Sequence, residues 1–265
     1  MPVIPSIAFG AAMGLSLGLT GGGGSILAVP LLVYGLGLDL RVAVTVSLAV
    51  VGLTALFGAL IQARSGQVLW RSGLVLGVGG ILVAPAGAFL GTIVADDVVL
   101  ILFALLMVVV GVRMARSRTE APEIPIGRFA CPIGEGGRPS PTLSCFAKLA
   151  GAGAVVGLLS GFFGVGGGFL LVPALIFVGS VRIEPALATS LVAIALISVS
   201  GFAANVGAVG EFPLLLAATF GAGGAGGMIV GAVVKRRLPS VVLNRVFAAV
   251  AIAAGIYVVA QVVIG

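Results

Sequence analysis

The chain has 265 residues, of which 60% are apolar, 8% are charged and none is histidine. A soluble domain carries about 25% charged residues, so this composition excludes an ordinary water-soluble fold and indicates a protein dissolved in lipid. The net charge of +6 does not indicate nucleic-acid binding, because the basic residues lie between apolar runs and form no basic face with interleaved aromatic residues.

In chain order, the first predicted element is an apolar stretch from Val3 to Leu38 with glycines near its middle. One straight helix of this length would be far too long for a bilayer core of about 30 Å, because a helix rises about 1.5 Å per residue. We therefore predict a hairpin of two shorter helices that enters and returns, either re-entrant or fully spanning. Three predicted membrane-spanning helices follow it: Val42–Ile61, Ser72–Val94 and Val98–Met114.

A polar connector over about Ser117–Lys148 is rich in proline and glycine and is predicted to be a loop. It contains both cysteines of the chain, Cys131 and Cys145. In a cytoplasmic loop we expect two free thiols, because a disulfide needs the oxidising side of the membrane; their role is left open. A second hairpin over about Leu149–Val181 and three further predicted spans complete the chain: Ile183–Ala203, Pro213–Val234 and Val241–Val263.

The two halves are related by an internal repeat. Gly14–Pro30 and Gly157–Pro173 share a glycine-rich pattern that ends in proline, at an offset of 143 residues, and the same offset pairs Ser47 with Ser190. A repeat of this extent indicates a duplicated membrane unit. We predict an all-α polytopic membrane protein of two repeats, each a glycine-broken hairpin followed by three transmembrane helices. The predicted parts are a first repeat over 1–116, the connector over 117–148 and a second repeat over 149–265.

The charge distribution predicts how the repeats are oriented. An odd number of crossings after each hairpin inverts the second repeat relative to the first. This arrangement places 13 of the 14 basic residues on one side of the membrane and leaves Arg41 alone on the other. Because basic residues are retained in the cytoplasm, we expect an inner-membrane protein with a cytoplasmic connector and both termini outside.

The glycines at the two hairpin turns are predicted to form a substrate site. Irregular backbone at membrane depth persists only where it lines a cavity or is buried in protein, and a helix that begins there presents unpaired amides that attract anions. The turns of inverted repeats are expected to converge near the midplane; close helix packing is the alternative role of such glycines. The predicted binding residues are Thr20, Gly22, Gly23, Gly24 and Ser25 in the first turn and Gly166, Gly167 and Gly168 in the second.

Polar side chains near these turns are further candidates for anion binding. Thr45, Ser47, Thr189 and Ser190 begin the span after each hairpin, and Gln62 and Asn205 lie at equivalent span ends. The alternatives are hydrogen bonds to the helix backbone or between helices, and interfacial caps for Gln62 and Asn205. Arg41 and Arg182 flank the hairpin exits and are expected to attract an anion at the two mouths of the pathway.

The middle of the predicted spans contains no Asp, Glu or His. Neither a proton relay nor an enzyme with paired intramembrane carboxylates is therefore predicted, and no metal or other cofactor is expected. Because the cell interior is negative, an exported anion gains about 2.3 kcal/mol per charge per 100 mV. This favours export without a coupling ion.

The motifs Gly21–Pro30 and Gly164–Pro173 resemble the sulfite exporter TauE/SafE family of bacterial membrane permeases. The resemblance covers both halves outside the connector and implies transport of a small sulfur oxyanion or organosulfonate, usually outward. We therefore expect a secondary transporter whose partners are a small anion and the lipid bilayer. The alternatives are an importer or channel for a related anion such as thiosulfate, and a membrane scaffold without transport activity. The coupling ion and the oligomeric state stay open.

Overall fold

The computed structural model describes residues 3–64, 66–116, 142–179, 181, 183–207, 209–210, 212–235, 248–249 and 252–261. Within these ranges the chain is helical and has no strand, and six helices are long and apolar enough to cross a membrane. The prediction of an all-α polytopic membrane protein is thus confirmed. Arg182 and residues 117–141 of the connector, including Cys131, lie outside the described ranges.

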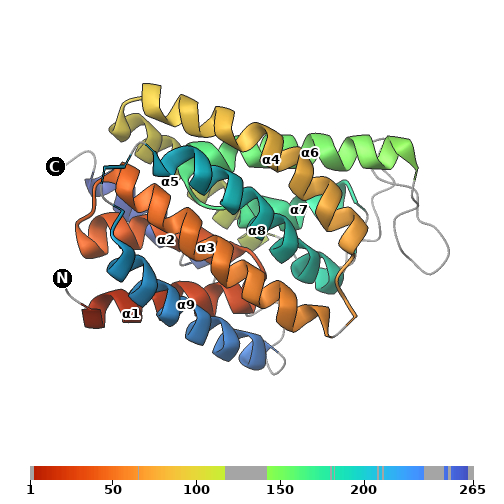
Figure 1. The fold of residues 1–265 in the computed structure, drawn as a ribbon, viewed down its shortest axis with the longest axis horizontal. Coiled ribbons are helices and arrows are strands. Elements are labelled where there is room, and N and C mark those ends of the chain that lie inside the picture. The colour runs from red at the N-terminus through yellow and green to blue at the C-terminus, as the bar shows by residue number, and fades with distance from the viewer. Residues whose placement is uncertain are drawn as a thin grey trace.

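The first half contains a broken hairpin and three long helices (Figure 1). α1 (Val3–Thr20) ends at a glycine turn, and a short arm returns through η1 (Gly23–Leu27), α2 (Ala28–Pro30) and η2 (Leu31–Gly35). The arm changes from 3-10 to α to π geometry around Pro30, because proline has no amide hydrogen to donate to the preceding turn. The long helices are α3 (Leu40–Ala63), α4 (Trp70–Ile93) and α5 (Asp96–Arg116).

The second half repeats this order with α6 (Leu143–Phe163), α7 (Gly168–Phe177), α8 (Ile183–Val206) and α9 (Leu214–Lys235). A short apolar helix, Ile252–Gln261, is the last described element. The returning arms are too short to cross a membrane, but α1 and α6, with 18 and 21 residues, are long enough. Each hairpin therefore has a first arm that is longer than its returning arm.

The start of α6 differs from the prediction of a loop up to Lys148. The helix begins at Leu143, after an extended Thr142, because Leu143–Ala147 already supplies mostly apolar, helix-compatible residues. Its first turn carries Cys145, which is buried and disulfide-bonded, so the expectation of a free thiol is wrong for this residue. A disulfide persists on the oxidising side of a membrane, whereas the basic residues favour a cytoplasmic connector. These two features point to opposite orientations.

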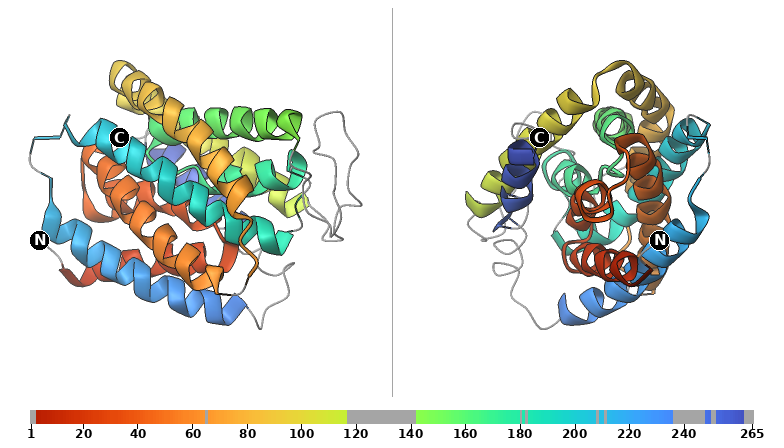
Figure 2. Two further views of the ribbon diagram at one scale, coloured as in Figure 1. Left: turned by 45° about the vertical axis from the view of Figure 1, so that its right-hand side comes forward. Right: turned by 90° about the vertical axis from the view of Figure 1, so that its left-hand side faces the viewer.

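Helices of one half pack against helices of the other half. α1 lies along α9, α4 lies along α6, and α3 packs against α8 (Figures 1 and 2). Glycines at every fourth position permit these contacts: Gly10, Gly14 and Gly18 of α1 face carbonyl groups of α9, and Gly153, Gly157 and Gly161 of α6 face carbonyl groups of α4. A Cβ atom at any of these glycines would collide with the neighbouring backbone, so the helices approach as closely as small residues allow.

The order of the interhelical contacts gives the helix directions. Gly10 meets Phe220 and Gly18 meets Met228, so α1 and α9 run parallel. On α3, Gly52 meets Ser198 whereas Gly58, further along, meets Leu191, so α3 and α8 run antiparallel. In Figure 1, α1 and α3 run from left to right, and α6 and α8 run from right to left. The first long helices of the two halves, α1 and α6, therefore run in opposite directions.

The outer surface of this bundle is apolar as well as its core. Leu82 is 76% exposed and Leu214 is 72% exposed, although both are large apolar residues. The buried residues that surround the glycine turns include Leu17, Leu171 and Ile194, each with no exposed surface. A protein with apolar side chains both inside and outside has lipid as its solvent. The polar groups of its interior are therefore the features that need a functional explanation.

Candidate functional site

The first hinge, Gly21–Gly24, joins α1 to η1 and is stabilised by serine hydroxyls. Gly21 has a φ of 71°, and its amide donates to the Leu17 carbonyl at 2.8 Å, which closes α1. The Gly21 carbonyl accepts a hydrogen bond from Ser190 Oγ of α8 at 2.9 Å. The Gly22 carbonyl accepts one from Ser25 Oγ, also at 2.9 Å. Two of the predicted binding residues therefore satisfy carbonyls that the broken helix exposes.

The other predicted residues of the first hinge also serve the backbone. Thr20 Oγ1 donates to the Ser16 carbonyl at 2.7 Å. Gly23 is the first residue of η1. Gly24 lies directly against α1, where a Cβ would collide with the Leu17 amide. The hinge is thus a tightly packed and hydrogen-bonded break in the helix.

The second hinge, Gly164–Gly168, joins α6 to α7 and has a different backbone. Gly164, Gly166 and Gly167 have φ values of 70°, 68° and 66°, a conformation that L side chains rarely adopt. α7 begins at Gly168, and Leu170 N donates to the Gly167 carbonyl at 3.0 Å. The first amides of a helix have no partner within it, so the start of α7 presents N–H donors and the positive end of the helix dipole to the hinge.

The two hinges meet in the interior of the bundle. A Cβ atom on Gly22 would collide with the carbonyl oxygen of Gly168, and a Cβ on Gly168 would lie 2.5 Å from the carbonyl oxygen of Gly22. Both glycines are buried. Only residues without a side chain allow this approach, and the contact joins the broken helix of one half to that of the other.

The predicted polar side chains do not all gather at the hinges. Thr45 Oγ1 donates to the Arg41 carbonyl at 2.9 Å, and Asn205 Nδ2 donates to the Gly201 carbonyl at 2.8 Å. Thr189 Oγ1 accepts a hydrogen bond at 2.9 Å from the amide of Leu69, the residue before α4.

Gln62 is half-buried near the end of α3 and takes part in a polar contact. Thr45, Asn205 and Thr189 thus follow the alternative of bonding to the helix backbone or between helices.

Three buried serine hydroxyls have no hydrogen-bond partner among the described residues: Ser47, Ser160 and Ser198. Leaving a buried hydroxyl unsatisfied costs about 1–3 kcal/mol, so such groups in one region call for a physical reason. Sequence reasoning identified only Ser47. Ser160 and Ser198 lie within apolar helices. The feature of the sequence that could have identified them is a hydroxyl residue that interrupts an apolar run.

A small pocket of about 30 Å³, lined by apolar residues and a few polar ones, lies beside the second hinge. Its lining brings together three of the predicted residues, Arg41, Thr45 and Asn205, with Asp96 and Thr92. The Arg41 guanidinium donates to the Thr92 carbonyl at 3.3 Å. Val44, which also lines the pocket, contacts Gly164. We call this pocket the vestibule; it connects an exposed arginine to the wall of the second hinge.

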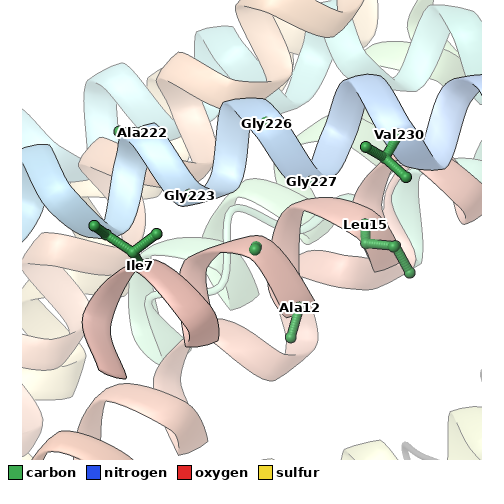
Figure 3. Close-up of a pocket in the computed structure, with 9 residues that line it drawn as sticks. Ile7, Ala12, Leu15, Ala222, Gly223, Gly226, Gly227 and Val230 are labelled. Carbon is green, nitrogen blue, oxygen red and sulfur yellow. The ribbon is translucent and has the colours of Figure 1, made fainter. Parts of the chain in front are cut away.

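A larger groove on the outer surface has the opposite character. It lies between α1 and α9 and is lined by small and apolar residues such as Ala12, Leu15, Gly226 and Val230 (Figure 3). Among the described residues, its lining supplies no charged or hydroxyl side chain, so it has none of the donors that an anion needs. The groove is therefore not a candidate site for a polar substrate.

A bundle of apolar helices with two broken hairpins that meet in its interior defines a multi-pass membrane transporter, because broken helices at membrane depth are the usual substrate sites of this class. A sequence profile for the family described as "Sulfite exporter TauE/SafE" matches residues 6–258. The chain belongs to this family.

Two similar proteins are also named as membrane transporters. A "Probable membrane transporter protein" of Xylella fastidiosa (strain Temecula1 / ATCC 700964) is 35% identical over 263 residues, which cover 97% of this chain and 95% of the relative. "Probable membrane transporter protein YunE" of Bacillus subtilis (strain 168) is 30% identical over 214 residues, or 76% and 77% of the two chains. No solved structure matches the chain.

Proposed function

We propose that this transporter exports a small sulfur oxyanion, such as sulfite or an organosulfonate, across the inner membrane, and that the anion binds where the two hinges meet. The contact between Gly22 and Gly168 carries the proposal. It brings the first hinge against the start of α7 in the other half, and the start of a helix is an anion site even without a charged side chain. The name of the family supports sulfite as the first anion to test.

Binding at this contact requires the hinges to separate. Gly22 and Gly168 touch through their backbones, so the described conformation has no room for an anion between them. Alternating access in transporters with inverted repeats is largely a rocking of one repeat against the other. We therefore assign the described conformation to an occluded state, which opens towards one side at a time.

The electrical driving force favours export. Each negative charge that leaves the negative cell interior gains about 2.3 kcal/mol per 100 mV. An intramembrane carboxylate would be the usual sign of proton coupling, and the predicted spans carry none in their middle. Uncoupled efflux down the potential is the simplest mechanism for this composition.

The vestibule supports a path from the second hinge to the exterior. Arg41 is the one basic residue that the predicted topology places outside, and it lines the vestibule together with Val44, whose side chain touches the hinge. A cation at the mouth of a cleft raises the local concentration of anions and speeds their association. We therefore assign to the exposed Arg41 a role in attracting the anion to the vestibule, whereas the hinges bind the anion.

Sulfite efflux from proteoliposomes tests the proposal, measured with and without an imposed membrane potential. We expect saturable efflux that follows the potential and is abolished by Gly166→Leu, because Gly166 has a positive φ and a Cβ there would lie 2.8 Å from Ser198 Oγ. Gly210→Leu is the matched control: Gly210 is exposed, and a Cβ there meets nothing within 4 Å.

Three outcomes of this experiment would contradict the proposal. Flux that requires an ion gradient would replace the exporter with a coupled importer. Flux that does not saturate would indicate a channel. Folded, inserted protein that moves neither sulfite, thiosulfate nor sulfoacetate would overturn the substrate and favour a scaffold.

A further inference from the structure

We propose that the anion binds on one side of the hinge contact only, at the second hinge, where Ser47, Ser160 and Ser198 donate to an –SO3 group. This inference rests on the proposed function and specifies its site. It starts from the three hydroxyls that are buried without a partner among the described residues. Each of these serines has 1% of its surface exposed or less.

Two of the serines lie directly beside the second hinge. A Cβ atom on Gly166 would lie 2.8 Å from Ser198 Oγ, and a Cβ on Gly167 would lie 3.3 Å from Ser160 Cβ. Ser198 comes from α8 and Ser160 from the last turn of α6. Their hydroxyls therefore border the same short segment from two different helices.

Ser47 belongs to the same group by its position on α3. Val44 contacts Gly164, and Val51 lies 2.8 Å from the Cβ position of Gly166. Residues three and four apart share a face of a helix, so Ser47, which is three residues from Val44 and four from Val51, lies on the face that α3 turns to the second hinge. Three helices thus each bring one hydroxyl to the second hinge.

The first hinge lacks this set of donors, although the two halves are repeats. At the repeat offset, Ser160 corresponds to Leu17 and Ser198 to Ala55, which have no hydroxyl. Ser190, the counterpart of Ser47, donates to the carbonyls of Gly21 at 2.9 Å and Leu187 at 3.0 Å. The polar groups of the first hinge are satisfied within the protein, whereas those of the second are not.

The donor set suits a trigonal –SO3 group. The three serine hydroxyls can each donate to a different oxygen of a sulfite or sulfonate, and the amides at the start of α7 add further donors. A carboxylate has only two oxygens in one plane and leaves part of the set unpaired. Because an unpaired buried donor is costly, the site should discriminate in favour of –SO3 between anions of equal charge.

Serine-to-alanine variants of the full chain test the inference by two readouts, the Kd for sulfite and the Tm. Ser160→Ala and Ser198→Ala should each raise the Kd for sulfite about tenfold, the loss expected for one hydrogen bond to a charged group. Their Tm should not fall, because these hydroxyls have no partner among the described residues. Ser200→Ala is the matched control on α8, because Ser200 Oγ donates to the Ile81 carbonyl at 2.9 Å; it should lower the Tm and leave the Kd unchanged.

The outcomes separate this inference from the proposed function. A wild-type Kd in both Ser160→Ala and Ser198→Ala, with flux still lost in Gly166→Leu, would overturn the serine site and leave the exporter standing. Wild-type protein that neither binds nor transports sulfite would overturn both. Methanesulfonate should compete with sulfite and acetate should not; equal competition by acetate would overturn the selectivity for –SO3.

Discussion

Substitution of Gly22 by alanine perturbs the hinge contact with a single methyl group. Gly22 has a φ of 178°, an extended conformation that alanine adopts without strain, so the effect comes from the collision alone. The new Cβ would overlap the Gly168 carbonyl oxygen and lie 2.8 Å from its carbonyl carbon, whereas ordinary contact begins at 3.4 Å. One hinge must therefore retreat by more than half an ångström. Overpacking of this kind costs about 1–3 kcal/mol.

We expect Gly22→Ala to lower the Tm of the purified protein by several degrees, because about 1 kcal/mol corresponds to about 2–4 °C for a chain of this size class. Sulfite efflux should fall as well, because the occluded state can no longer close. Gly226→Ala is the matched control: a Cβ at Gly226 meets nothing within 4 Å, and alanine favours a helix over glycine by about 1 kcal/mol. A Gly22→Ala protein with wild-type Tm and wild-type efflux would refute the reasoning that the hinges act through direct contact.

Four further perturbations have defined outcomes. Ser190→Ala should lower stability by about 1–3 kcal/mol in thermal unfolding, because it leaves the Gly21 carbonyl without its donor; an unchanged Tm would show that this bond is dispensable. Thr189→Val keeps the shape but removes the acceptor of the Leu69 amide, so a loss of about 1 kcal/mol is expected for the missing hydrogen bond, and no loss would show that this bond is dispensable. Arg41→Gln should raise the KM for sulfite at low salt and much less at high salt, with a Tm shift that reflects no more than about 0.5 kcal/mol; a KM effect that salt does not alter would exclude steering. Alkaline phosphatase inserted at residue 125 should be inactive if the connector is cytoplasmic, since that enzyme needs the oxidising side for its disulfides; an active fusion would instead agree with the disulfide at Cys145.

The helical architecture and the hinges were predictable because both leave strong sequence signals. Apolar runs long enough to cross a bilayer are rare outside membrane-spanning helices, and the glycines around Gly22 and Gly166 recur at one offset. The two hinges were expected to converge, but the particular contact between Gly22 and Gly168 could not be predicted from the sequence. The unequal lengths of the hairpin arms could not be predicted either, because hydropathy does not mark where in an apolar stretch the chain turns.

The polar residues were harder to assign because a hydroxyl in a membrane helix has several possible partners. Thr45 and Ser47 are two residues apart on α3, yet Thr45 bonds to the Arg41 carbonyl and Ser47 has no described partner. The sequence does not distinguish these states, since both depend on the neighbouring helices. Ser160 and Ser198 were overlooked for the same reason. The disulfide of Cys145 depends on proximity in space, which spacing along the chain does not reveal.

The packing of α1 on α9 and of α4 on α6 also constrains how the protein is made. α1 ends at Thr20, and α9 begins only at Leu214, so the ribosome must synthesise Gly21–Pro213 before the partner of the first helix appears. During that interval the glycine-lined face of α1 lies against lipid or an insertion factor, and the first repeat has no means of completing its own interior. The first helix of each repeat packs against a helix of the other repeat, so the interior is complete only when both repeats are present.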